Sequence, residues 1–230
     1  MRFKLNRSNL AENFCMALNL NVFLEAPRQT GKTVGSACRY LYVYNFASTN
    51  TKMAFLHKNA EGSKDNLQTL KDIRDCLPPY LQMKERVLPD GKTDKGRDSV
   101  TMMTNPFNNN NIKTFASATN KAKAASLLRG KTITMMWYDE YGFLPFNDII
   151  YMNGAPAYKT ASMLAKQNGS PYGILITTTP GSRHVGSYTT TISIYLYVVV
   201  LLTSLNCWNM LKLSCLIYKR RNSETIREMV

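Results

Sequence analysis

A short apolar run that leads straight into a loop ending in Gly-Lys-Thr constrains the fold of this chain most. Residues 22–24 (Val-Phe-Leu) have the character of a buried strand, and residues 26–33 read Ala-Pro-Arg-Gln-Thr-Gly-Lys-Thr. A strand that turns through such a loop into a helix presents backbone N–H groups to a bound phosphate. Ala26 stands where the usual form of this loop has its first glycine, so the loop by itself is weak evidence and the remaining chain must support it.

Each residue type in this loop has a role in phosphate chemistry. Gly31 allows the backbone to approach the phosphates, Lys32 reaches the terminal phosphates, and the Thr33 hydroxyl can occupy one position on Mg²⁺. Arg28 is close enough in sequence to meet charge that develops on the γ-phosphoryl group, although a solvated surface cation would have the same spacing. The loop therefore predicts ATP and Mg²⁺ as ligands. The predicted nucleotide-binding residues are Gln29, Thr30, Gly31, Lys32 and Thr33.

Strands and helices alternate along most of the chain. The predicted strands are residues 21–25, 53–57, 132–138 and 174–176, with a hairpin over 99–104 and 112–116. The predicted helices are residues 1–18, 32–48, 60–77 and 147–167. This alternation favours an α/β fold with a mainly parallel central sheet and helices on both faces. Ligands of such sheets bind at the carboxyl ends of the strands, which is where all polar signatures of this sequence fall.

Two further signatures follow predicted strands. Asp139 and Glu140 end the strand 132–138. A carboxylate at a strand end can hold Mg²⁺ and its neighbour can polarise an attacking water, so we assign Asp139 to the metal and Glu140 to catalysis. An acidic first turn of a helix is the alternative. The last signature is a run of hydroxyls that could sense the γ-phosphate, or that could merely reflect the preference of threonine for strands: Thr177, Thr178 and Thr179.

The charge balance leaves two kinds of protein open. The chain has 29 Lys and Arg against 15 Asp and Glu, a formal net charge of +14. Such an excess is typical of a protein that binds a polyanion, most simply nucleic acid, but a protein that is merely basic would show it too. A local basic cluster has the same two explanations: Lys121, Lys123, Arg129 and Lys131. Five scattered cysteines and two histidines favour free thiols in a reducing compartment rather than a zinc site.

Taken in order, the three signatures resemble the ATPase motifs of the large terminase subunit of tailed phages. The matching segments are residues 28–33, 135–140 and 176–181. The loop of that family commonly reads Arg-Gln-x-Gly-Lys-Thr and need not begin with glycine, which accounts for Ala26. Residues 126–130 (Ser-Leu-Leu-Arg-Gly) and 56–58 (Leu-His-Lys) also resemble segments of the family, and the resemblance covers about residues 20–183.

The resemblance implies a motor domain that hydrolyses ATP to drive double-stranded DNA into a viral prohead. It also implies a portal protein and a small terminase subunit as partners, a homo-oligomeric ring, and action in the host cytoplasm. The threonine signature would couple hydrolysis to movement from a strand that lies between the two other motif-bearing strands. By this resemblance, Arg28 would act in cis as the arginine that meets the γ-phosphate, and Lys32 and Thr33 would contact the phosphates and the metal. Asp139 would be the Mg²⁺ ligand and Glu140 the catalytic carboxylate.

Two features depart from the family. It usually places an adenine-contacting glutamine about twenty residues before the loop, but no glutamine precedes Gln29 here, and Asn9 and Asn13 are only stand-ins. The family also carries a C-terminal nuclease domain, which needs several converging carboxylates. After Asp148 the chain has no acidic residue until Glu224, so nuclease activity is not expected.

We therefore expect residues 1–186 to form the ATPase domain, truncated before the nuclease, and residues 187–230 to be an atypical apolar tail. Residues 185–211 carry no charge. The most apolar stretch, residues 192–202, is shorter than the about 20 residues that a membrane span needs. A shifted reading frame near residues 182–190 is the favoured explanation of the tail. The alternatives to a packaging motor are a DNA helicase-like ATPase and a non-catalytic fragment of an interrupted terminase gene, or a membrane-tethered adaptor.

Overall fold

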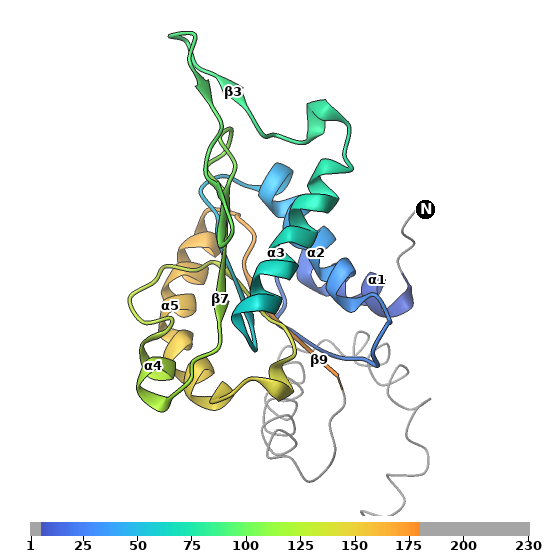
Figure 1. Ribbon diagram of the computed structural model, residues 1–230, viewed down its shortest axis with the longest axis vertical. Helices are drawn as coiled ribbons and strands as arrows, with labels where there is room; N and C mark the ends of the chain where they lie inside the picture. The colour runs from blue at the N-terminus through green and yellow to red at the C-terminus, as the bar shows by residue number, and fades with distance from the viewer. Residues whose placement is uncertain (1–5, 180–230) are drawn as a thin grey trace, which may run out of the picture. The chain divides into compact units, whose positions relative to one another are not determined.

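In the computed structural model, which describes residues 6–179, a seven-stranded sheet forms the centre of the fold (Figure 1). Five neighbouring strands run parallel, in the order β1 (Val22–Glu25), β9 (Gly173–Thr178), β8 (Met135–Tyr138), β2 (Lys52–His57) and β7 (Asn111–Ala116). The sheet ends in two short antiparallel strands, β6 (Met102–Thr104) and β5 (Asp98–Ser99). The predicted α/β fold with a mainly parallel sheet is confirmed, as is the predicted hairpin, which β6 and β7 form.

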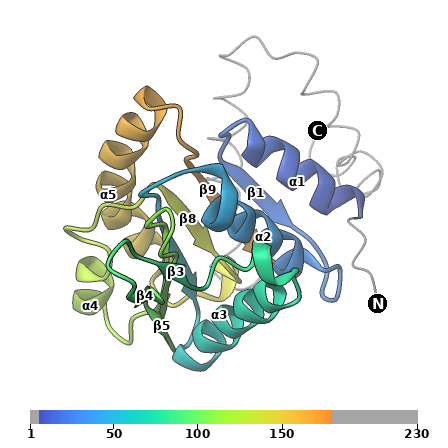
Figure 2. The same ribbon diagram turned by 90° about the horizontal axis from the view of Figure 1, so that it is seen from above.

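Helices cover both faces of this sheet (Figure 2). On one side lie α1 (Arg7–Ala17), α2 (Lys32–Tyr42) and α3 (Ala60–Asp75), and on the other lie α4 (Lys121–Ser126) and α5 (Asn147–Gln167). A π-helical turn, Val43–Ala47, extends α2, and short 3-10 turns occupy Pro79–Leu81 and Tyr141–Phe143. A separate two-stranded ribbon pairs β3 (Arg86–Val87) with β4 (Thr93–Asp94). Three of the predicted helices are confirmed as α2, α3 and α5, while α4 has no counterpart among the predicted ones.

The hydrophobic core lies between the sheet and the helices α2 and α3. Its centre is aromatic: the ring of Trp137 lies 4.6 Å from that of Phe55 and 5.4 Å from that of Tyr40. Leu67 and Leu70 of α3 are fully buried in the same cluster. Burying each of these side chains contributes about 1.5–3 kcal/mol. The strands that carry the polar signatures are therefore anchored by large, tightly packed side chains.

The first helix forms as predicted, but its apolar stripe is not its buried side. Leu10, Phe14 and Leu18, whose spacing indicates the helix, are 47–60% exposed. The buried side chains of α1 are Asn9, Glu12 and Met16. Two of the three are polar because α1 packs against the beginning of α2, where polar groups of the loop and of the helix provide hydrogen-bond partners.

The expectations for the tail concern residues that the structure does not describe. The predicted boundary near residue 186, the shifted reading frame and the apolar character of residues 187–230 all lie outside residues 6–179. Within residues 6–179, none of the helices combines the length and the hydropathy needed to cross a bilayer.

Candidate nucleotide-binding site

Three adjacent parallel strands bring the three sequence signatures to one edge of the sheet. β9 lies between β1 and β8, the position that the family resemblance implies for the threonine-bearing strand. In the strand register, Glu25 pairs with Thr178 and Tyr138 pairs with Ile176. Because the strands are parallel and in register, the loop after β1, the carboxylates after β8 and the hydroxyls at the end of β9 leave the sheet together.

The loop between β1 and α2 enters the helix through a glycine in the left-handed conformation. Gly31 has a φ of 72°, in the left-handed region that glycine adopts without strain, and it immediately precedes α2. No side chain caps the N-terminus of α2, so the N–H groups of its first turn remain available to an anion. Thr30 Oγ1 donates to the carbonyl of Pro27 at 2.9 Å and so closes the loop on itself. Arg28 and Gln29 are exposed on its outer side.

Lys32 connects the loop to the threonine signature. Its amine is buried and donates to the carbonyl oxygen of Ala26 at 3.2 Å and to Thr179 Oγ1 at 2.5 Å. Desolvation lowers the pKa of Lys32, and the carboxylates of Asp139 and Glu140 oppose that shift. The amine is thus held by protein groups at the point where a terminal phosphate would lie in a loop of this kind.

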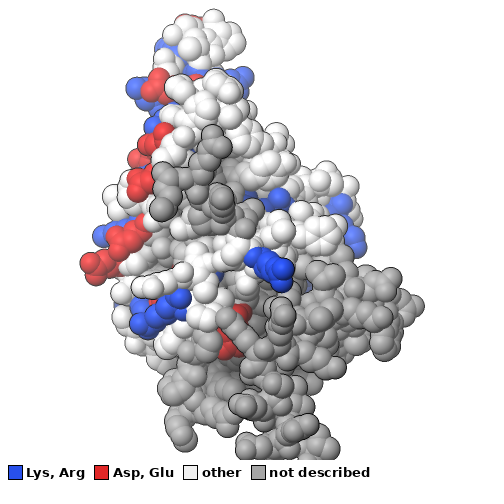
Figure 3. Space-filling view, turned by 90° about the vertical axis from the view of Figure 1, so that its right-hand side faces the viewer, with Lys and Arg blue, Asp and Glu red and all other residues white. Residues whose placement is uncertain are grey.

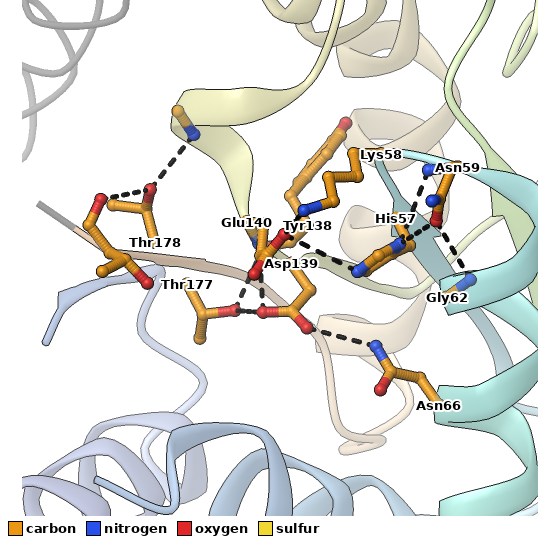
Figure 4. Close-up of polar contacts among 12 residues, drawn as sticks. His57, Lys58, Asn59, Gly62, Asn66, Tyr138, Asp139, Glu140, Thr177 and Thr178 are labelled. Atoms are coloured by element: carbon orange, nitrogen blue, oxygen red, sulfur yellow. Dashed lines mark hydrogen bonds and ion pairs between the residues drawn. The ribbon is translucent and has the colours of Figure 1, made fainter. Parts of the chain in front are cut away.

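Asp139 is the most enclosed acidic group of the site (Figure 4). It is 3% exposed, and its carboxylate accepts hydrogen bonds from Thr177 Oγ1 at 2.7 Å, from Asn66 Nδ2 at 3.2 Å and from the Glu140 backbone N–H at 3.0 Å. Burial raises the pKa of Asp139, although the Thr177 hydrogen bond lowers it. The indole N–H of Trp137 donates to Thr177 Oγ1 at 2.9 Å, so the hydroxyl proton is free to point at Asp139. The aromatic core therefore orients the carboxylate.

Glu140 is held by the end of the neighbouring strand β2. The Lys58 ammonium lies 2.7 Å and His57 Nε2 3.9 Å from Glu140 Oε2, and Asn59 Oδ1 lies 3.0 Å from the other ring nitrogen of His57 (Figure 4). Partial burial raises the pKa of Glu140, but the hydrogen bond and charge of Lys58 outweigh it, and the pKa ends below its ordinary value. Glu140 also has a φ of 50°, an unusual conformation for a residue with a side chain. Such backbone strain is typical of functional positions.

The three threonines of the last signature have three different partners. Thr177 donates to Asp139, Thr179 accepts from Lys32, and Thr178 Oγ1 accepts from the backbone N–H of Gly142 at 3.1 Å. Gly142 belongs to the 3-10 turn that follows the carboxylates. The end of β9 is therefore connected by hydrogen bonds to both other signatures, an arrangement that can pass a change at one of them to the other.

A second set of polar residues supports the loop from behind, and sequence reasoning gave them no such role. Asn6 Nδ2 donates to the carbonyl of Thr30 at 2.6 Å, and Asn9 Nδ2 donates to that of Gly31 at 3.3 Å. Asn13 Nδ2 in turn donates to the carbonyl of Asn9 at 2.8 Å. Asn9 and Asn13, the stand-ins for an adenine-contacting residue, are thus both engaged within the protein, and Asn9 is 1% exposed.

A buried carboxyl group lies next to this set. The Ser36 hydroxyl oxygen lies 2.6 Å from Glu12 Oε1 and 2.9 Å from the carbonyl oxygen of Lys32, so its single proton is shared between the two acceptors. Burial raises the pKa of Glu12 to about 7; the Ser36 hydrogen bond lowers it and the charge of Asp139 raises it further. The first turn of α2, which follows the loop, therefore rests on a carboxyl group that changes charge near neutral pH.

Comparison with known proteins relates this fold to one group. No family model matches the sequence, and no curated protein is similar to it in sequence. Among solved structures, the large terminase of a thermophilic bacteriophage matches with a TM-score of 0.55 and 14% identity, over 77% of this chain and 40% of that chain. The large terminase of bacteriophage HK97 matches with a TM-score of 0.54 and 16% identity, over 86% of this chain and 38% of that chain.

A further structure of the thermophilic phage's large terminase, in complex with ATP-gamma-S, matches with a TM-score of 0.51 and 14% identity, over 76% of this chain and 38% of that chain. The chain is thus an α/β protein with its polar site at the carboxyl ends of parallel strands. Its fold is that found in these large terminases, as the resemblance of the three signatures implies, and it spans about two fifths of their length.

Proposed function

We propose that this chain is the ATP-hydrolysing part of a DNA-packaging motor of the large-terminase type. The observation that carries the proposal is the convergence of three signatures, far apart in sequence, into one hydrogen-bonded site: Lys32 contacts Thr179, and Thr177 contacts Asp139. The fold shared with phage large terminases, one of them in complex with ATP-gamma-S, supports it.

The donor groups of the site fit Mg²⁺ and a nucleotide triphosphate. The left-handed Gly31 and the uncapped first turn of α2 would receive the phosphates, with Lys32 at their terminal end. The Thr33 hydroxyl, which makes no hydrogen bond within residues 6–179, and the Asp139 carboxylate would hold the metal. Oxygen donors of this kind are what Mg²⁺ prefers. A metal ion held there would supply positive charge that offsets the negative charge of the phosphates.

Glu140 is the residue suited to activate water. Its pKa below the ordinary value keeps it ionised at neutral pH, so that its carboxylate can accept a proton. Lys58 holds that carboxylate at the end of β2. Arg28, which is exposed on the same loop, would meet charge that develops on the γ-phosphate. The threonines at the end of β9 would pass the loss of that phosphate to the turn at Gly142.

The partners belong to the same proposal. A motor of this type acts on double-stranded DNA in the host cytoplasm, docked as a ring of copies on a portal, with a small terminase subunit. This chain covers about two fifths of the large terminases whose fold it shares, and we assign the ATPase step to it.

The test is hydrolysis of Mg²⁺-ATP by the full chain, with and without duplex DNA, beside Glu140→Gln. We expect Glu140→Gln to lower turnover by roughly 10²- to 10⁴-fold while nucleotide binding persists. Glu85→Gln is the matched control, because it changes an exposed carboxylate far from Glu140 in the sequence, and it should keep full turnover.

The same assay separates the alternatives. Stimulation by duplex DNA without strand separation supports a packaging motor, whereas unwinding of the duplex supports a helicase. If the parent protein is folded by circular dichroism but hydrolyses no ATP, the chain is a non-catalytic fragment and the proposal fails.

A further inference from the structure

Charge is distributed unevenly over the part of the chain that the structure describes. Residues 58–98 contain nine Lys or Arg and eight Asp or Glu, and six of those cations form ion pairs. On the face drawn in Figure 3, acidic and basic side chains accordingly lie close together along one edge. Residues 99–138 contain five Lys or Arg and no acidic residue before Asp139. None of those five forms an ion pair with a described residue.

Three unpaired lysines line a shallow depression, two of them beside one aromatic ring, and we call this depression the basic hollow. It is lined by Lys52, Lys113, Lys131 and Phe115, together with Asn111 and Thr132. The ammonium groups of Lys113 and Lys131 lie 5.4 Å and 5.5 Å from the centroid of the Phe115 ring. Cation–π contacts of this length hold lysine side chains in place without neutralising them.

The hollow is remote from the nucleotide site in the topology of the sheet. Lys52 begins β2, Asn111 begins β7 and Thr132 precedes β8, so most of the hollow lies toward the amino-terminal ends of these parallel strands. Phe115 extends it along β7. Along β7, Ile112 and Thr114 are buried toward α3, whereas Lys113 and Phe115 point to the other face. The hollow shares no lining residue with the nucleotide site, so an anion bound there would be a different ligand from the nucleotide.

From this arrangement we infer that the basic hollow is a contact surface for the sugar-phosphate backbone of duplex DNA, an inference that rests on the proposed function. Three lysines that line one hollow repel each other, and no carboxylate in the hollow relieves that repulsion. A DNA strand offers a phosphate about every 3.4 Å, which suits several cations side by side. Lysine acts as a point charge and reads no base sequence, as a motor that moves along any sequence requires.

The salt dependence of DNA binding tests this surface. A short fluorescent duplex of mixed sequence is titrated with the full chain, without nucleotide, over a range of KCl concentrations. The variant carries Lys52→Gln, Lys113→Gln and Lys131→Gln. The slope of log K against log salt should decrease in magnitude by about 0.9 for each lysine that contacts a phosphate.

A charge-matched control carries Lys84→Gln, Lys92→Gln and Lys95→Gln, three lysines that pair with acidic residues. Its net charge equals that of the hollow variant, so a general effect of charge would appear in both. The inference is overturned if the parent does not bind the duplex, if the hollow variant keeps the parental slope, or if the control loses as much. Binding to polyglutamate is measured in the same way. If the hollow variant loses affinity for polyglutamate but not for the duplex, the hollow binds an acidic protein and the inference is also overturned.

The outcome is separable from that of the ATPase assay. Hydrolysis without DNA depends on Lys32 and Glu140, and duplex binding without nucleotide depends on the hollow. A silent ATPase with a reduced salt slope would refute the motor and leave the DNA surface standing. Normal hydrolysis with an unchanged salt slope would support the motor and refute the DNA surface.

Discussion

The two ends of the sheet hold their charged side chains in opposite ways. At the carboxyl ends of the strands, Lys32 and Asp139 are buried and Glu140 is half-buried, and each has protein partners within hydrogen-bond or ion-pair distance. Toward the amino-terminal ends, Lys52 and Lys113 are exposed and pair with no acidic residue among residues 6–179. The contrast is sharpest for lysine, which occurs at both ends.

This difference reflects the size and shape of the ligand that each end suits. A small charged ligand that reacts in its site is stabilised most by groups that are already fixed in place before it binds. Such groups act most strongly in surroundings that exclude water. A long polyanion gains affinity mainly from the release of counterions to several exposed cations. Buried, paired charges therefore indicate a reaction site at the carboxyl ends of the strands. Exposed, unpaired lysines indicate a binding surface for a polyanion toward the amino-terminal ends.

Among variants that compare the two ends of the sheet, we expect the largest effect on nucleotide affinity. Lys32→Ala removes the buried ammonium at the terminal-phosphate position, and a charge-assisted hydrogen bond is worth about 1.5–3 kcal/mol. We expect the Kd for Mg²⁺-ATP, measured with a fluorescent analogue, to rise roughly 10- to 100-fold. Lys92→Ala, at an exposed and paired lysine, should leave the Kd unchanged. Equal effects of both variants would abolish the distinction between buried and exposed lysines.

The next effect concerns the pH dependence of stability through Glu12. Its pKa of about 7 in the folded protein lies above the ordinary 4.5, so the folded state keeps a proton that the unfolded state loses. The contribution of this group to stability is complete below the unfolded pKa and is lost as pH rises toward 7. From the linkage relation, the free energy of unfolding should fall by about 2 kcal/mol between about pH 5 and pH 7.

Urea unfolding of the parent and of Glu12→Gln at both pH values checks this prediction. Gln cannot titrate but can still accept the hydrogen bond of Ser36, so the variant should lack this part of the pH dependence. Asp139, whose pKa burial also raises, is present in both proteins and contributes in the same direction in each. Parallel pH profiles of the two proteins would show that Glu12 is ionised in the fold.

The sequence predicted the carboxyl end of the sheet far better than the other end, for a physical reason. A strand, a loop and a helix N-terminus are contiguous in the chain, so the residues at 26–33 carry their own local signal. Because parallel strands align their ends, the signatures at Asp139 and Thr177 could be placed beside that loop before any contact was known. The contacts that fix them, such as Asn66 to Asp139, join distant segments and leave no periodic pattern.

The same reason explains what was missed. The basic hollow joins Lys52 to Lys113 and Lys131, about sixty and eighty positions later. Of the sequence cluster Lys121, Lys123, Arg129 and Lys131, only Lys131 lines the hollow. In α1, the apolar spacing of Leu10 and Phe14 correctly indicates a helix but not its buried side. The buried side of α1 is determined by polar contacts with the beginning of α2, and the spacing of apolar residues does not reveal such contacts.

A smaller effect tests whether the core orients the buried carboxylate. Thr177→Val leaves the Trp137 N–H without its acceptor and removes one donor from Asp139, both in buried surroundings. The free energy of unfolding should fall by roughly 1 to 2 kcal/mol in a urea titration. Thr69→Val, at a partly exposed threonine of α3, should change it by less than about 0.5 kcal/mol. Similar losses in both variants would contradict a specific role for the Thr177 hydroxyl.

The smallest effect concerns Lys58, which combines the properties of both ends because it is paired with Glu140 although its side chain is 41% exposed. Lys58→Met should change stability by less than about 1 kcal/mol, since exposed ion pairs contribute little. Without the ammonium, the pKa of Glu140 should rise, and the acidic limb of the pH–rate profile should move to higher pH. Lys84→Met, which breaks a similarly exposed pair with Asp75, should leave that limb in place. If the acidic limb of the pH–rate profile stays in place in Lys58→Met, the ion pair with Lys58 does not set the pKa at which Glu140 acts.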